Sequence, residues 1–200
     1  MKKLFIILSL VLLLALTACG PNRNVQRVST DQTTDLSGRW NDTDSRLVAE
    51  EMVRDLLTRP FVGNFTSKNG RPPYVIVGTV KNLSSEHIAT DVFVKDIERE
   101  LLNSGTVRFV ASRSDRDDIR DERLDQQSQA TEESAKRLAA EVGADYMLQG
   151  SIKTIIDRVE GVQAKFYQVD MQLINIENNL TEWMGNKSIK KVVSQRGYKL

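Results

Sequence analysis

The sequence predicts an α+β protein with a central, mostly antiparallel sheet of about four to five strands flanked by helices. Two observations predict this class. Apolar residues recur at helical spacing in the first half of the folded region, whereas residues 146–200 alternate apolar and polar side chains with a period of two. Helices that precede a run of sequential strands indicate α+β rather than a regular alternation of strands and helices.

The N-terminus predicts a lipoprotein signal peptide over residues 1–18. Lys2 and Lys3 supply a positive start, and residues 4–16 are apolar apart from Ser9. This run is too short to cross a bilayer, which takes roughly 20 apolar residues. A targeting segment is therefore favoured over an anchor helix.

Cys19 is the single cysteine of the chain and follows that run directly. The segment Leu16-Thr17-Ala18-Cys19 resembles the bacterial lipobox, in which the thiol is attached to diacylglycerol and the signal is then cleaved in front of it. We therefore expect Cys19 to be the lipidated N-terminus of the mature chain. Several acyl chains attached there would anchor the protein far more firmly than one. The alternative is an ordinary signal peptide with an incidental cysteine. Gly20 stands where an aspartate would retain such a lipoprotein at the inner membrane, so we expect outer-membrane sorting, facing the periplasm.

The composition indicates how the fold is stabilised and which classes of partner it does not favour. With Cys19 acylated, the chain has no thiol left for a disulfide, so the fold must depend on its core. The 28 basic residues less Lys2 and Lys3 leave 26, against 27 acidic residues, a formal charge of −1 for the mature chain. A nearly neutral chain of this kind does not favour nucleic acid or an anionic membrane surface.

The domain organisation follows from a change in composition. Residues 20–44 are dominated by polar side chains and hold too few large apolar residues to form a core. We therefore predict an acylated N-terminus and flexible tether over 19–44, which would span about 85 Å if fully stretched. Residues 45–200 suit one globular domain.

The first half of this domain predicts two helices and two strands. Thr43, Asp44 and Ser45 are candidate N-caps of a helix that Pro60 ends. A second helix would be capped by Thr90 or Asp91, with Gly105 in a left-handed position after it. The residues expected to face inward from these helices are Leu47, Val48, Met52, Leu56 and Leu57, then Val94, Ile97, Leu101 and Leu102.

The first strand is predicted over Tyr74–Val80, which is apolar on both alternating faces and so favours the inside of the sheet. A short strand is predicted over Val107–Ala111. The segment Arg113–Gln127 alternates charge at three- and four-residue separations, which is typical of a solvated helix. Thr131–Val142 predicts a further helix, closed by Gly143.

The last part of the chain predicts an antiparallel meander. Its strands are expected over Met147–Asp157, around Tyr167–Leu173, and over Thr181–Lys191. Turns are predicted at Glu160-Gly161 and Asn178-Asn179. In the middle strand, apolar residues alternate with Gln168, Asp170 and Gln172, which gives that strand one solvated face.

The sequence shows no arrangement of residues typical of an enzyme. His87 is the single histidine and lies in a polar loop, and Ser84 and Ser85 are too close to it along the chain to define a triad. One histidine and one acylated cysteine cannot make a zinc site, and no phosphate-binding loop follows any glycine. We predict no catalytic residue, no metal and no cofactor.

Two points stay open on the residues alone. Glycoside cleavage needs two carboxyl groups at a defined separation in space, which the sequence does not give. A periplasmic glycan hydrolase is therefore a remaining hypothesis. Trp40 and Trp183 are expected to serve packing, the alternative being an interface. An anchored, nearly neutral domain without catalytic groups is most simply a binding module.

Four segments together resemble the LpoB family of outer-membrane lipoproteins: Ser37–Met52, His87–Ser112, Ala135–Ile152 and Tyr167–Asn179. The resemblance implies a fold related to the N-terminal domain of TolB. It also implies that residues 45–200 bind the regulatory domain of a class A penicillin-binding protein, a bifunctional glycosyltransferase and transpeptidase, and activate it. Cys19 matches the acylated cysteine of the family, and the resemblance implies no enzyme activity.

The partner contacts are not identified by the resemblance, and the tether is shorter and poorer in proline than in well-known members. Candidate docking surfaces are the polar strand face at Gln168, Asp170 and Gln172 and the charged helix Arg113–Gln127. We expect a monomer. The alternative function is a structural or secretion lipoprotein of the CsgG-like group, although no pair of lipid-facing hairpins is evident.

Overall fold

The structure is a computed structural model that describes residues 25–128 and 143–194. The chain divides into two compact units, Met1–Gln32 and Thr33–Leu200. In the described part of the first unit, Gln32 donates a 3.1 Å backbone hydrogen bond to Ser29 and closes a turn. The predicted signal peptide (1–18), Cys19 and the predicted helix 131–142 lie outside the described residues.

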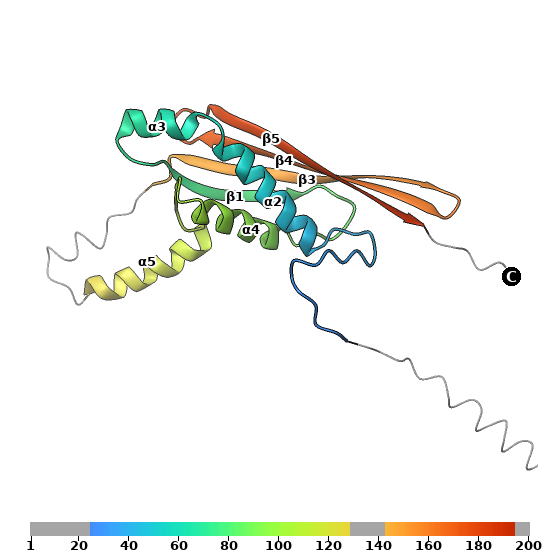
Figure 1. The fold of residues 1–200 in the computed structure, drawn as a ribbon. Helices are drawn as coiled ribbons and strands as arrows, with labels where there is room; N and C mark the ends of the chain where they lie inside the picture. The colour runs from blue at the N-terminus through green and yellow to red at the C-terminus, as the bar shows by residue number, and fades with distance from the viewer. Residues whose placement is uncertain (1–24, 129–142, 195–200) are drawn as a thin grey trace, which may run out of the picture. The chain divides into compact units, whose positions relative to one another are not determined.

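The second unit contains the described helices and strands (Figure 1). The sheet order is β2-β1-β3-β4-β5, and β1 is parallel to both of its neighbours, whereas β3, β4 and β5 form an antiparallel meander. The α+β class and a five-stranded sheet are therefore confirmed. The relation to the TolB domain stays a prediction. In chain order the elements are α2 (Asp42–Leu57), α3 (Phe61–Asn69), β1 (Tyr74–Asn82), α4 (Thr90–Asn103), β2 (Arg108–Phe109), α5 (Arg113–Ser128), β3 (Tyr146–Val159), β4 (Val162–Asn175) and β5 (Thr181–Ser194).

The core lies between one face of the sheet and the helices α2 and α4 (Figure 1). In β4, strict alternation turns Tyr167, Val169, Met171 and Leu173 toward the helices, and all four are buried. Most of the predicted inward helix residues are part of this core. The prediction was wrong for Leu47 and Leu102, which lie at the outer border of each helical stripe. Their side chains are 45% and 62% exposed.

The N-terminus of α2 corrects the predicted cap. The N-cap is Asn41: its side chain accepts a 3.0 Å hydrogen bond from the Asp44 N–H, and the Asp44 carboxylate accepts a 2.9 Å bond from the Asn41 N–H. This reciprocal pair is a capping box. Thr43, Asp44 and Ser45 are instead buried inside the first turn. The predicted tether, 19–44, therefore overlaps the second compact unit, which begins at Thr33.

Two further helix boundaries differ from expectation. Pro60 does more than end α2, because it is also the N-cap of α3, a helix that was not predicted from the sequence. Phe61 of α3 packs edge-on against Tyr146, with ring centroids 5.6 Å apart. The N-cap of α4 is Ala89, without a side-chain hydrogen bond, rather than Thr90 or Asp91. The left-handed conformation of Gly105 after α4 is confirmed, with φ of 64°.

The expected strands and turns of the meander are confirmed, and the strands are longer than predicted. Glu160 and Gly161 both have positive φ, as the tight turns that fit the twist of a hairpin require. Asn179 adopts φ of 62° in the second turn. The predicted inside strand is also confirmed, since β1 lies between β2 and β3 and Val75, Ile76 and Val77 are consecutively buried.

Trp183 connects β5 to α2 and makes Gly185 intolerant of a side chain. The indole Nε1–H donates a 2.8 Å hydrogen bond to the Asp55 carboxylate, and a Cβ added at Gly185 would overlap the indole ring. We expect Gly185→Ala to lower the free energy of unfolding by about 1–3 kcal/mol, because the ring must move. Urea unfolding followed by tryptophan fluorescence measures this.

Gly63→Ala is the matched control for that variant. Nothing lies within 4 Å of a Cβ at this helical glycine, so its stability should be unchanged or slightly higher. Wild-type stability in Gly185→Ala would contradict the packing described for Trp183.

Candidate partner-binding surface

The segment Thr33–Asn41, here called the N-terminal strap, is the first part of the second unit and packs onto its core before α2 begins. Trp40 makes edge-on ring contacts with Phe93 and Tyr167, at centroid distances of 6.1 and 5.7 Å. The Tyr167 hydroxyl oxygen lies 3.2 Å from the Gly38 carbonyl oxygen. The sequence prediction of a packing role for Trp40 and Trp183 is confirmed, because both contact core residues.

Lys191 of β5 makes three hydrogen bonds, two to the strap and one to Asp44 of α2. Its ammonium donates to the carboxylates of Asp35 and Asp44, each at 2.6 Å, and to the Arg39 carbonyl at 3.1 Å. Burial alone would lower the pKa of Lys191, but the bonds to Asp35 and Asp44 outweigh it and raise the pKa. The strap is therefore attached to the sheet by a charged cluster whose lysine side chain is only 8% exposed.

A second charged cluster lies beneath the strap. The Lys165 ammonium donates a 2.6 Å hydrogen bond to one Glu86 oxygen, and the Tyr167 hydroxyl donates a 2.7 Å bond to the other. The Lys165 and Glu86 side chains are 7% and 12% exposed. Burial would raise the pKa of Glu86, but the bonds from Lys165 and Tyr167 lower it overall. Burial, followed by the bond to Glu86, raises the pKa of Tyr167.

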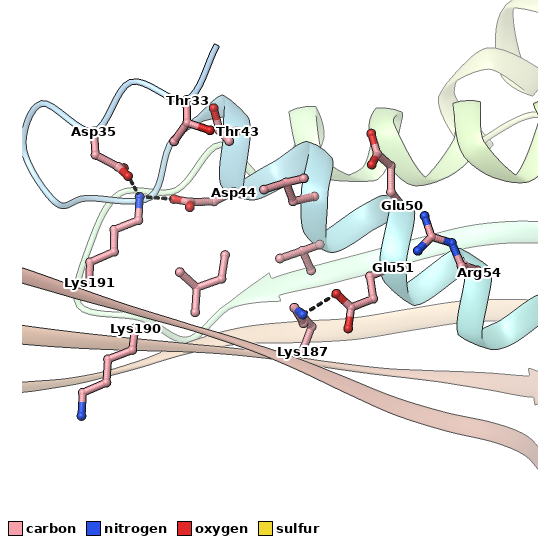
Figure 2. Close-up of a pocket in the computed structure, with 13 residues that line it drawn as sticks. Thr33, Asp35, Thr43, Asp44, Glu50, Glu51, Arg54, Lys187, Lys190 and Lys191 are labelled. Atoms are coloured by element: carbon pink, nitrogen blue, oxygen red, sulfur yellow. Dashed lines mark hydrogen bonds and ion pairs between the residues drawn. The ribbon is translucent and has the colours of Figure 1, made fainter. Parts of the chain in front are cut away.

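A groove of about 410 Å³ lies between α2 and β5 (Figure 2). We call it the α2–β5 groove. Its helix wall is formed by Leu47, Glu50, Glu51 and Arg54, and its strand wall by Lys187, Ile189 and Lys191. The strap residues Thr33 and Asp35 close one end. Figure 2 shows that Lys190, which also borders the groove, points away from α2.

Thr43 lines the closed end of this groove and carries a buried hydroxyl that bonds to no described residue. An unsatisfied buried hydroxyl costs about 1–3 kcal/mol, whereas valine has nearly the same shape. We expect Thr43→Val to raise the free energy of unfolding by about 1 kcal/mol, measured by urea unfolding. Thr30→Val, at an exposed position, should leave it unchanged. A loss of stability in Thr43→Val would show that the hydroxyl has a partner.

The polar strand face proposed for docking exists as a surface, but two of its three residues, Gln168 and Asp170, bind each other. Gln168 donates a 2.7 Å hydrogen bond to the Asp170 carboxylate, which also pairs with Lys153 at 2.9 Å. Burial would raise the pKa of Asp170, and the bonds from Gln168 and Lys153 lower it overall. Gln172 and the 71% exposed Met184 line a hollow of about 440 Å³ on this face.

The charged helix proposed for docking is confirmed as α5. Its predicted side-chain pairing is seen between Arg120 and Asp117, three residues apart, at 2.8 Å. Asp115 also lies 3.7 Å from Lys95 of α4. The charges on this helix are therefore at least partly neutralised within the domain.

The residues considered for catalysis have other contacts. His87 is exposed in the loop between β1 and α4. The Ser84 hydroxyl donates a 2.6 Å hydrogen bond to the Asn82 side chain, and the Ser85 N–H donates to the Thr154 hydroxyl. Within residues 25–128 and 143–194, no cluster of three histidine, cysteine or acidic side chains could hold a metal ion.

Cys19, the predicted lipidation site, is outside the described part of the chain. Among the helices that the structure describes, none has the length and apolar character needed to cross a membrane.

The charged pairs of Glu86, Lys165 and Lys191 were not predicted from the sequence. One signal was readable: Lys165 and Lys191 have the same parity as the inward residues Tyr167 and Ile189 of their strands, so each lysine had to point toward the core side. Their acidic partners gave no such signal. Glu86 lies 79 positions from Lys165 in the sequence.

Comparison with known families gives a match to the model described as peptidoglycan-synthase activator LpoB over residues 44–189. Comparison with curated proteins gives no match. Among solved structures, the LpoB C-terminal domains of Escherichia coli and Salmonella enterica are 17% and 18% identical. Each covers 74% of this chain and 99% of its own, with TM-scores of 0.45 and 0.43. Lipoprotein GNA1162 from Neisseria meningitidis is 13% identical over 64% of this chain and 88% of its own, with a TM-score of 0.39.

Proposed function

Because the chain belongs to the LpoB family of peptidoglycan-synthase activators, we propose that it binds and activates a bifunctional class A penicillin-binding protein. The observation that supports this proposal is the extent of the family match. Residues 44–189 run from the first turn of α2 to within the last strand, so the match includes the whole core rather than one motif. The proposed partner region is the regulatory domain of the synthase.

The proposal includes a lipid anchor at Cys19 in the outer membrane, with the folded unit facing the periplasm. The anchor confines the domain near its partner, so modest contacts suffice for binding. Because the N-terminal strap is part of the second unit, only residues 20–32 separate Cys19 from it, a span of at most about 45 Å. The synthase must therefore be met close to the anchored surface.

Activation in this proposal is a shift between two conformations of the synthase. A regulator that bound both conformations equally would shift nothing, so the domain must bind the active one more tightly. The domain needs no chemistry of its own for this, and we propose that it is a monomeric regulator without enzyme activity or cofactor.

In-cell photo-cross-linking tests the partner. A photoreactive residue is placed separately at Leu47 in the α2–β5 groove, Gln172 on the polar face and Ile119 on α5, three surface positions on different elements. We expect at least one position to trap a class A penicillin-binding protein. Trapping only proteins that do not build peptidoglycan would contradict the proposal.

A further inference from the structure

The outer edge of β5 is a free strand edge. β5 is the last strand in the sheet order, and within the described residues it pairs only with β4. It has 14 residues and no proline. A long edge without proline presents a row of unpaired backbone N–H and C=O groups, which is a template for a further strand.

A helix runs beside that edge and makes it a groove. Leu47, Glu50, Glu51 and Arg54 follow the spacing i, i+3, i+4, i+7, so they form one stripe along α2, while Val48 and Met52 on the adjoining stripe are buried in the core. All four residues line the α2–β5 groove, and Figure 2 shows Glu51 pointing toward Lys187 of β5, with which it forms an ion pair. Between Lys187 and Lys191 the groove accommodates about five residues of extended chain, or roughly 17 Å.

The charges in the groove define what fits it. Glu50, Glu51, Lys187 and Lys191 each have a charged partner, whereas the exposed guanidinium of Arg54 makes no hydrogen bond or ion pair with any described residue. Each wall also carries an apolar side chain: Leu47 on the helix wall is 45% exposed, and Ile189 on the strand wall is partly buried. The existing pairs are Arg46–Glu50, Glu51–Lys187 and Lys191 with Asp35 and Asp44.

The geometry points to the α2–β5 groove as the site where an extended segment of the synthase adds to the sheet as a sixth strand, beside β5. Backbone hydrogen bonds to β5 give affinity, and side chains in the groove give specificity. The segment carries apolar side chains over Leu47 and Ile189 and a carboxylate that pairs with Arg54. This inference rests on the proposed function, because it names the surface through which the activator meets its synthase.

Replacing single groove residues by glutamate tests whether the synthase binds in the groove. The full mature chain with Arg54→Glu or Leu47→Glu is measured for binding to the purified synthase. We expect each variant to bind at least about tenfold more weakly, since a repelled or unpaired charge in the groove costs more than about 1.4 kcal/mol. Arg108→Glu is the matched control, because this exposed arginine lies on β2, at the opposite edge of the sheet. It should bind within about twofold of the wild type.

Hydrogen exchange of the unmodified chain provides a readout that does not depend on a variant. Backbone amides of β5 around Lys187–Lys191 should exchange more slowly when the synthase is bound, which a contact through side chains alone would not produce. Unchanged exchange and unchanged affinity of both groove variants would overturn the inference and leave the proposed function standing. Slow exchange in the chain alone, together with a dimer by light scattering, would assign the groove to a second copy instead. Absence of any binding by the wild type would overturn both proposals.

Discussion

Replacing Glu86 by glutamine is expected to lower the free energy of unfolding by about 3–5 kcal/mol, because it leaves the Lys165 ammonium buried without its counter-ion. The side chain of Lys165 is 7% exposed, and no other described carboxylate forms an ion pair with it. Glutamine keeps an oxygen that can accept the Tyr167 hydroxyl, so the variant removes the charge rather than the shape. Urea unfolding followed by circular dichroism measures the loss.

The double variant Glu86→Gln/Lys165→Met is the control for that expectation. Replacing both charges of a buried pair by groups of similar volume is often neutral or stabilising. The double variant should therefore recover most of the lost stability. If it is as unstable as Glu86→Gln alone, the loss came from packing around residue 86 and not from the unpaired lysine.

The pH dependence of stability gives an independent check on the same pair. The pKa of Glu86 is lower in the folded protein than its ordinary value of 4.5. Its contribution to stability is therefore complete above pH 4.5 and is lost as the pH falls through the lowered pKa. As the pH falls from about 5 to below the lowered pKa of Glu86, the free energy of unfolding should decrease more for the wild type than for Glu86→Gln. The glutamine side chain has no proton to bind at this position. Parallel curves for the two proteins would contradict the pairing.

Replacing Cys19 by serine is expected to remove the protein from the membrane fraction of the cell. Each buried methylene of an acyl chain contributes about 0.8 kcal/mol, so losing all the chains removes the whole of the proposed anchorage. Cell fractionation and metabolic labelling with a fatty-acid analogue measure the change. Ser29→Ala, at an exposed described position, should remain membrane-bound and labelled.

The same variant separates anchoring from activation. Because the folded unit begins at Thr33, Cys19→Ser should fold normally and still bind the synthase when both are purified. It should fail only in the cell, where confinement near the synthase is lost. A Cys19→Ser protein that stays in the membrane fraction and takes up label would contradict lipidation at this residue.

The meander and the main helices could be predicted because their signals are local. The period-two alternation around Val169 and the spacing of Ile97 and Leu101 each occur within one element. The two apolar faces of β1 predict a place inside the sheet, but its neighbours β2 and β3 have no local signal, because they depend on the paths of the connections between strands. The short helix α3 has one buried residue, Phe61, and so shows little periodicity.

The candidate site was harder to predict, because its residues come from elements that are far apart in the sequence. The α2–β5 groove joins two elements from opposite ends of the folded unit, and Glu51 and Lys187 become neighbours only when β5 packs beside α2. The N-terminal strap was interpreted as tether because its composition is polar. Its attachment depends on Lys191, more than 150 residues away.

The most direct test of the activator role is the rate of glycan polymerisation by the purified cognate class A penicillin-binding protein, with and without residues 20–200 of this protein. We predict that the added protein raises the rate at saturating lipid-linked substrate, and that the protein alone releases no fragments from purified peptidoglycan. An unchanged rate in the presence of the correct synthase would contradict the account.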